Sequence, residues 1–167
     1  QIELSKTPNE PVLIDGQQFD WVIDCRGLGA QTESSDLRGV RGEVARVYAP
    51  EVELNRPVRL MHPRYPIYIA PKPNHEFVIG ATEIESQDNG PITVRSTLEL
   101  LSAAYTVHSG FAEARVMAMN AGLRPAFSDN RPRIERNGNV IRINGLYRHG
   151  YLLAPAVVFE ALSKGLL

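Results

Sequence analysis

The chain has 167 residues, 43% of them hydrophobic and 22% charged, which fits one ordinary globular unit with its own core and excludes a disordered or fibrous chain. Its formal net charge of −1 provides no global field that would attract nucleic acid or an anionic membrane. A single cysteine, without any Cys/His cluster at metal-ligand spacing, excludes an internal disulfide, argues against a structural zinc and fits a reducing, cytoplasmic compartment.

The two ends of the chain indicate a piece of a longer protein. The chain opens without a Met, on an alternating pattern at Ile2 and Leu4, as though in mid-strand. It stops at Leu167 directly after a helical pattern, without a polar tail. The first residues, Gln1 to Pro11, are unlike a signal peptide, and no apolar run approaches the roughly 18 to 20 residues that a membrane-spanning helix needs. We therefore expect a fragment with no membrane span.

A strand, a glycine turn and several β-rich stretches are predicted for the first half. Trp21 to Asp24 is an apolar run typical of a buried strand, Cys25 is most simply a core thiol, and the glycines of Arg26 to Ala30 allow a tight turn. Further β-rich stretches are Val44–Tyr48, Val58–Met61, Ile67–Ala70 and Glu76–Ile79. Prolines, which cannot donate to a central ladder, mark the turns between them: Pro50, Pro57, Pro63, Pro71 and Pro73.

A helix and a closing strand–loop–helix unit are predicted for the second half. Ser96 and Glu99 have the spacing of a capping box, and apolar residues then recur at helical intervals over about 97–108 until Gly110. Two more strands and a last helix are expected over 116–119, 140–143 and about 153–162. A glycine-flanked loop, Asn144 to Gly150, leads into that helix. The predicted fold class is α+β with a substantial, mostly antiparallel sheet.

Two arginines are placed where an anionic ligand could bind. Arg124, in Gly122-Leu123-Arg124-Pro125, follows a strand, and its planar guanidinium, directed from a sheet edge by the proline, would match a carboxylate. Arg148 lies in the loop before the last helix, where free N–H groups and the helix dipole favour negative charge. The alternatives are a solvated or salt-bridged arginine at 124 and an ordinary turn around 148.

Other candidate residues give weaker signals. Tyr68, in an apolar strand, could present its hydroxyl to a ligand or simply pack into the sheet. No carboxylate pair and no Ser/His/Asp order supports hydrolytic catalysis. Gly27-Leu28-Gly29 lacks the third glycine of a dinucleotide fingerprint, so the chain alone cannot bind a dinucleotide pyrophosphate in the usual way. Arg131, Arg133 and Arg136 form a basic cluster without interleaved aromatic residues, so a non-enzymatic arginine-rich module that binds RNA or an acidic partner is the alternative from a different class.

Five segments of the chain contain recognisable motifs, and their order and spacing along the chain are more specific than any single motif. They are Val22–Ala30, a strand and glycine turn; Leu37–Glu43, similar to "P-x-rGe"; Tyr68–Lys72 with Val78–Glu83, similar to "Tyr-x-x-Pro-(Arg/Lys)" and "vGaT"; Gly122–Pro125 with Asp129 and Pro132; and Asn144–Pro155. Together they resemble the D-amino acid oxidase and glycine oxidase family of FAD-dependent oxidoreductases, and Asn144–Pro155 is most similar to the glycine oxidases of thiamine biosynthesis. The chain departs from the family pattern at Arg26, where a small residue is usual, and at Glu83, where an apolar residue is common.

The resemblance implies a division of the chain and a set of site residues. Residues 1–36 would be the return strand and glycine turn of the FAD domain, 37–122 a substrate-binding sheet domain with one helix, and 123–167 a flavin-facing strand–loop–helix of the FAD domain. The implied substrate-binding residues are Arg124, Arg148, Tyr68 and Glu83. The implied FAD-contacting residues are Gly27, Leu146, Tyr147, Arg148, His149, Gly150, Tyr151 and Leu152. Most of the FAD would be held by a half that precedes Gln1, and neither a metal nor a catalytic acid or base is implied.

The resemblance also implies an activity for the intact enzyme. It is the oxidative deamination of glycine, or another small amine, to the imine, with dioxygen consumed and hydrogen peroxide released, in supply of thiamine thiazole synthesis. Arg124 would hold the substrate carboxylate and Tyr68 would donate to it, while Arg148 and the N–H groups of 146–152 would face negative charge on the reduced flavin. A sarcosine or D-amino acid oxidase or dehydrogenase is the nearest alternative. We expect a homo-oligomer at full length, no nucleic acid partner, and no FAD binding or turnover by the fragment alone.

Overall fold

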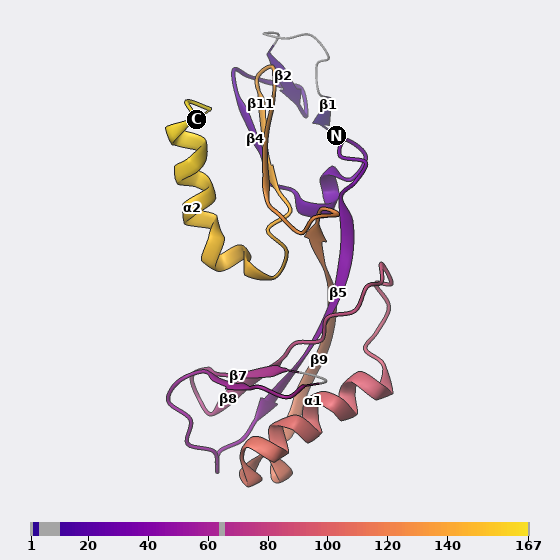
Figure 1. Ribbon diagram of the computed structural model, residues 1–167, viewed down its shortest axis with the longest axis vertical. Helices are drawn as coiled ribbons and strands as arrows, with labels where there is room; N and C mark the ends of the chain where they lie inside the picture. Colours follow the sequence, from indigo (N-terminus) through magenta and orange to yellow (C-terminus); the bar gives the residue numbers. More distant parts are fainter. Residues whose placement is uncertain (1, 4–10, 64–65, 167) are drawn as a thin grey trace. The chain divides into compact units, whose positions relative to one another are not determined.

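The computed structural model describes residues 2–3, 11–63 and 66–166, and these form two compact units (Figure 1). The first unit contains residues 1–39 and 124–167, and the second contains residues 40–123. The chain passes from one to the other inside two long strands, β5 (Arg38–Tyr48) and β9 (Arg115–Ala126). The segments expected from the sequence divide after residues 36 and 122, and the roles assigned to them stay a prediction.

The first unit combines two small sheets with one helix. One sheet is antiparallel, in the order β1 (Ile2–Glu3), β2 (Val12–Ile14) and β3 (Gln17–Phe19). The other has the order β10 (Arg133–Asn137), β11 (Val140–Asn144) and β4 (Val22–Asp24), and its β11–β4 pair is parallel. Helix α2 (Gly150–Ser163) and two short 3₁₀ helices, Gly27–Ala30 and Tyr147–His149, complete the unit. Leu4, part of the expected opening pattern, lies outside the described residues.

Helix α2 is apolar over most of its surface. One side packs on β11, where Val157 and Ala161 are buried in one cluster with Ile141 and Ile143. The rest of the helix exposes five large apolar side chains, those of Tyr151, Leu152, Val158, Phe159 and Leu162. The helix begins at Gly150, three residues before the expected start. A helix that is apolar all round is usually covered on every side.

The second unit is a five-stranded sheet with a helix against one face (Figure 1). Its strand order is β6 (Val58–Leu60), β7 (Ile67–Pro71), β8 (Glu76–Gly80), β5 and β9, and the pairs β6–β7, β7–β8 and β8–β5 are antiparallel. Alternate strand residues, among them Val47, Ile69 and Ile79, form one core with Leu100 and Ala104 of helix α1 (Val94–Val107), which the 3₁₀ helix Ser109–Glu113 follows. The predicted α+β class with mostly antiparallel sheets is confirmed. Within the described ranges, no helix is long and apolar enough to cross a membrane.

Helix α1 begins three residues before the expected start, and the predicted capping box is wrong. The N-cap is Thr93, whose Oγ1 accepts a hydrogen bond from the Ser96 N–H at 3.2 Å. Ser96 is buried in the first turn of the helix. Thr93 and Ser96 each have a hydroxyl that could cap the N-terminus of a helix, and each is followed three residues later by a residue that could complete the cap. Packing buries Ser96 in the first turn, so Thr93 is the N-cap.

The strand predicted over Trp21 to Asp24 exists as β4, but its predicted burial is wrong. Trp21 and Ile23 are about half exposed, and only Asp24 is buried. The Arg136 guanidinium instead lies over the Trp21 ring, 4.5 Å from the ring centroid. Cys25 is exposed too, which corrects its interpretation as a core thiol. The reason is the position of β4, which is the outermost strand of its sheet in the described part of the chain.

Two prolines lie inside strands, one of them among those expected to mark turns. Pro71 is the last residue of β7 and pairs with Phe77. Lys72 donates its N–H to the Glu76 carbonyl at 2.7 Å, so the nitrogen of the preceding Pro71 is directed away from β8. On that side β6 pairs only with Ile67 to Ile69, so no strand hydrogen bond is lost at Pro71. Pro125 lies within β9, so Arg124 belongs to that strand rather than following it. β9 is the last strand in the sheet order, and an outermost strand has one side without a strand partner, so the missing N–H of Pro125 is tolerated there.

Candidate functional site

Three segments that are far apart in the sequence meet at Gly27 in the first unit. The buried Asn144 donates from Nδ2 to the Gly27 carbonyl at 2.9 Å, and its Oδ1 accepts the Gly145 N–H at 2.8 Å. Gly27 has a positive φ of 60°, and a Cβ there would lie 3.5 Å from Pro125. The glycine turn, the Arg124-Pro125 pair and the loop after β11 are therefore fixed to one another.

Gly145 anchors the start of the loop after β11. Its φ is +76°, and a Cβ would stand 2.3 Å from the ring of Phe127, a distance that no side chain tolerates. The Phe127 ring is buried and has the Arg133 guanidinium 4.1 Å from its centroid. Only glycine satisfies both the backbone and the space at this position.

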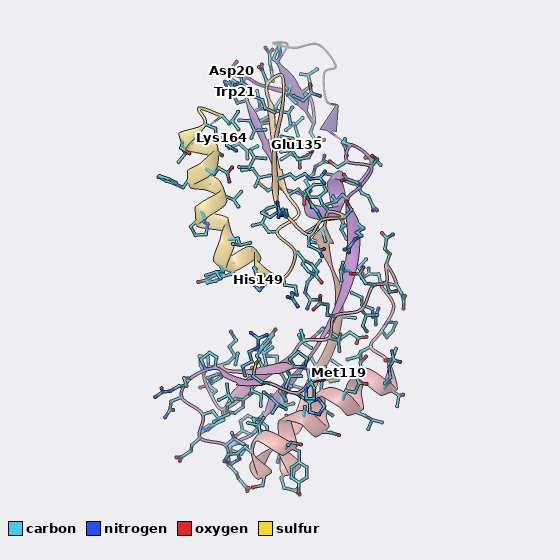
Figure 2. All side chains as sticks on the ribbon, viewed as in Figure 1. Asp20, Trp21, Met119, Glu135, His149 and Lys164 are labelled. Carbon is cyan, nitrogen blue, oxygen red and sulfur yellow. The ribbon has the colours of Figure 1, made fainter. Side chains whose placement is uncertain are left out.

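The loop and first turn of α2 carry the predicted flavin-facing residues. They pass through the 3₁₀ helix Tyr147–His149, and Arg148, His149, Tyr151 and Leu152 are exposed (Figure 2 labels His149 beside the start of α2). The Arg148 guanidinium lies 5.5 Å from the Tyr147 ring centroid. Among the described residues, no side chain caps the first turn of α2, and that turn has no acidic residue. Free N–H groups beside two basic side chains form a region suited to negative charge.

Arg124 is half-buried on β9 and belongs to the first unit, as Arg148 does. The next residue, Pro125, lies close to Gly27. Tyr68 and Glu83 belong to the second unit and are exposed. Each predicted site residue is thus placed within its own unit, and their joint action on one ligand stays a prediction.

An ion cluster around Asp24 accounts for the unusual Arg26. The buried Asp24 carboxylate accepts from Arg26 Nε at 2.9 Å and Nη2 at 2.8 Å, and from Arg142 Nε at 3.2 Å. Hydrogen bonds from Arg26, despite the opposing effect of burial, lower the pKa of Asp24 to about 2. Arg26 also bonds Glu33 at 3.2 Å. The sequence signal was the Asp-x-Arg spacing, and it marks a structural pair.

Tyr68 in the second unit lies directly over Gly80. The two residues are register partners on β7 and β8. A Cβ on Gly80 would come within 2.8 Å of both the Tyr68 hydroxyl and Val44 Cγ1. The side chain at position 80 must therefore be absent for Tyr68 to take this position, in which it is 41% exposed.

A buried ion pair that sequence reasoning missed lies on β5. Arg41 and Glu43 are almost fully buried, with Nη2 and Oε1 2.8 Å apart. Arg41 also donates to three main-chain carbonyls, those of Asp88 at 2.7 Å, Gly90 at 2.9 Å and Pro91 at 2.6 Å. The Arg-Gly-Glu of the "rGe" pattern is the signal that could have located this pair.

Thr82 attaches the end of β8 to the same carboxylate. Its Oγ1 donates to Glu43 Oε2 at 3.0 Å and accepts the Glu43 N–H at 2.9 Å. Burial would raise the pKa of Glu43, but hydrogen bonds from Ser96, Arg41 and Thr82, with the Arg41 charge, lower it below its usual value. Glu43 is therefore an anion at neutral pH. It binds Thr82, and the predicted site residue Glu83 directly follows Thr82 in the sequence.

The same unit has a hollow of about 510 Å³. It is lined by Val44, Arg46, Lys72, Pro73, Asn74, Glu76, Val78 and Asn120. Arg46 and Glu76 form an ion pair across it, with Nη2 and Oε2 2.6 Å apart. No residue predicted for the site is among this lining. The described residues also hold no group of three His, Cys, Asp or Glu side chains that could bind a metal ion.

Comparison with known proteins places this geometry in a family. A family model described as "FAD dependent oxidoreductase" matches residues 3–158, nearly the whole chain. The chain belongs to the FAD dependent oxidoreductases. ThiO of Rhizobium etli, named as a candidate thiamine biosynthesis oxidoreductase, is 55% identical over 145 residues, which are 87% of this chain and 44% of that protein. The resemblance found in the sequence is thereby confirmed.

Two further relatives share less of their sequence with this chain. A glycine oxidase of Bacillus licheniformis is 31% identical over 120 residues, 70% of this chain and 31% of that protein. The crystal structure of a glycine oxidase from Bacillus cereus matches with a TM-score of 0.78 at 24% identity, over 99% of this chain and 49% of that one, which is a likeness of fold. The chain spans less than half the length of these relatives.

The residues of the first unit fit part of a flavin site. The first turn of α2, which contains no acidic residue and follows Arg148 and His149, has N–H donors of the kind that suit the anionic edge of a reduced flavin. Gly27-Leu28-Gly29 remains short of a dinucleotide fingerprint. These donors fit the ring of FAD rather than its pyrophosphate, and that they contact FAD stays a prediction.

Proposed function

We propose that this chain is the substrate-binding and flavin-facing part of a glycine oxidase-type enzyme. Together with a flavin-binding half of the kind that its longer relatives have, it would oxidise glycine or another small amine to the imine, release hydrogen peroxide and supply thiamine thiazole synthesis. The observation that carries the proposal is the junction at Gly27, because it joins the Arg124-Pro125 pair and the loop of Arg148 within one unit. The 55% identity to ThiO supports the thiamine role.

In this proposal the chain's own side chains bind and orient the amino acid. Arg124 holds the substrate carboxylate in a bidentate pair, and the exposed Tyr68 hydroxyl donates to the same carboxylate. Glu83 forms a polar part of the wall near the amine. The chain then works by positioning, and no side chain is required as an acid or base.

Residues 146–152 and Gly27 would hold the flavin ring. When bound, FAD accepts the hydride that leaves the substrate α-carbon. Arg148 and the N–H groups at the start of α2 would face negative charge on the bound flavin ring and so stabilise it. We also expect the flavin-binding half to cover the exposed apolar side of α2, and the complete protein to be a homo-oligomer.

A substrate panel tests the activity of the complete protein. We expect purified flavoprotein to consume oxygen and release hydrogen peroxide fastest with glycine, and more slowly with sarcosine, D-alanine and proline. Amine-dependent reduction of an artificial acceptor without peroxide would favour a dehydrogenase of the same family. A salt-sensitive RNA shift without any amine oxidation would instead support the arginine-rich binding module.

Arg124→Ala tests the carboxylate clamp. Because the lost ion pair belongs to substrate alone, we expect the KM for glycine to rise on the order of a hundredfold while bound FAD stays stoichiometric. Arg115, exposed on the same strand, provides the matched control, and Arg115→Ala should leave KM within twofold (roughly the range of surface substitutions). An unchanged KM in Arg124→Ala would refute the clamp.

A further inference from the structure

The segment between β8 and α1 has little regular structure of its own. Residues 81–93 contain only an isolated bridge, in which Ile84 exchanges two main-chain hydrogen bonds of 3.0 Å with Arg41. A loop of this kind keeps one conformation only if other parts of the fold hold it. What holds residues 81–93 therefore decides where their side chains stand.

The Arg41–Glu43 pair and its partners provide much of that hold. Glu43 bonds Thr82 through its carboxylate, its N–H and its carbonyl, the last accepting the Thr82 N–H at 3.2 Å. The Arg41 guanidinium bonds the carbonyls of Asp88, Gly90 and Pro91 near the other end. Both charged side chains are at most 3% exposed, so these bonds do not compete with bulk water.

The held segment begins where the proposed substrate residues of this unit lie. Tyr68 covers Gly80, two residues before Thr82 in the sequence. Glu83 directly follows Thr82. A shift of Thr82 would therefore move the wall residue and alter the surface on which Tyr68 rests.

We propose that Arg41, Glu43 and Thr82 are positioning residues that set the affinity for the amino acid by fixing Glu83 and the end of β8 beneath Tyr68. This inference rests on the proposed function. The ion pair acts through Thr82, and neither Arg41 nor Glu43 touches the substrate. Thr82 is the link that can be altered alone, because it is only partly buried and carries no charge.

The test uses three variants of the complete flavoprotein. Thr82→Val removes both hydroxyl bonds to Glu43 but keeps the shape, and Thr82→Ser restores the hydroxyl. Thr106→Val is the matched control, because Thr106 is exposed on α1 and its hydroxyl donates only locally, to the Ser102 carbonyl at 2.9 Å. Unfolding temperature and bound FAD are measured first for each variant.

For Thr82→Val we expect a KM for glycine about tenfold higher with kcat within about twofold, since the loss is one of substrate binding. The Kd of a non-reactive carboxylate inhibitor such as glycolate should rise by the same factor, and the backbone amides of residues 81–90 should exchange faster with deuterium. Thr82→Ser and Thr106→Val should resemble the parent protein in all three measurements.

Two results would overturn the inference, and they are distinguishable from a failure of the proposed function. If Thr82→Val lowers the unfolding temperature or speeds exchange but leaves KM and inhibitor Kd unchanged, the network is merely structural. If Thr82→Ser is as impaired as Thr82→Val, the hydroxyl is not the link. A parent protein that oxidises no amino acid would instead remove the proposed function itself, and this inference with it.

Discussion

Each unit contains a buried carboxylate paired with an arginine two residues away in the sequence, and the two pairs differ in what surrounds them. In the first unit, Asp24 is buried, but the Arg26 side chain is 31% exposed and their partners, Arg142 and Glu33, are side chains. In the second unit, Arg41 and Glu43 are both buried, and Arg41 bonds main-chain carbonyls 47 to 50 residues away.

The difference shows that the sequence spacing of an arginine and an acid says little about how much the pair contributes to the free energy of unfolding. The Asp24 cluster joins the end of β4 to the middle of β11, and water still reaches the Arg26 side chain. The Arg41–Glu43 pair replaces water for several main-chain groups of an irregular segment, so its loss would leave those groups and one charge unsatisfied. Burial of both partners, rather than spacing, separates the two cases.

Glu43→Ala should have the largest effect on stability. It removes the buried carboxylate of the pair and leaves Arg41 only the exposed Asp88 carboxylate, 3.5 Å from Nη1, so we expect a loss of about 3 kcal/mol in the free energy of unfolding. Denaturant unfolding of the complete protein measures it, with Glu43→Gln as a milder control that keeps the shape. If Glu43→Ala costs no more than a change at Asp24, the contrast between the two pairs is wrong.

Asp24→Asn should cost less and depend on pH. The pKa of Asp24 is lowered from 3.8 to about 2, which corresponds to about 2 kcal/mol, and the exposure of Arg26 reduces this to about 1–2 kcal/mol. Because the folded pKa is the lower one, the contribution is complete above about pH 5. It is lost as the pH falls toward 2.

Unfolding free energies of the parent protein and Asp24→Asn, measured between pH 6 and pH 2, test this sign. Their difference should shrink as the pH falls. A difference that grows toward acid pH would mean that another group carries the effect.

Glu33→Gln should have the smallest effect. Hydrogen bonds from Thr32 and Arg26 lower the pKa of Glu33, but its side chain is 27% exposed and Arg26 keeps Asp24 as its main partner. We expect a change within about 0.5 kcal/mol, and a smaller one in 1 M salt. A loss as large as that of Asp24→Asn would show that the cluster acts as one network.

Local patterns predicted much of the fold. The runs over 67–70, 76–79 and 140–143 lie inside β7, β8 and β11, as expected for short runs rich in β-branched and aromatic residues that turn residues end. The family could be identified as well, since its segments combine glycines, prolines and arginines in one order along the chain. Gly80 and Gly145 belong to these segments because a Cβ would collide with Tyr68 and Phe127.

The sequence by itself determined the element types, the family and the candidate residues Arg124, Arg148 and Tyr68. Only the tertiary structure decided which side chains are buried: Cys25 and Ile23 are exposed because β4 is an outermost strand, and Thr93 rather than Ser96 caps α1 because packing buries Ser96. It also decided the partners of Arg41. The physical reason is that strand and helix periodicity act over neighbouring residues, whereas burial and the main-chain partners of Arg41 depend on groups that the fold brings together, in the case of Arg41 from 47 to 50 residues away.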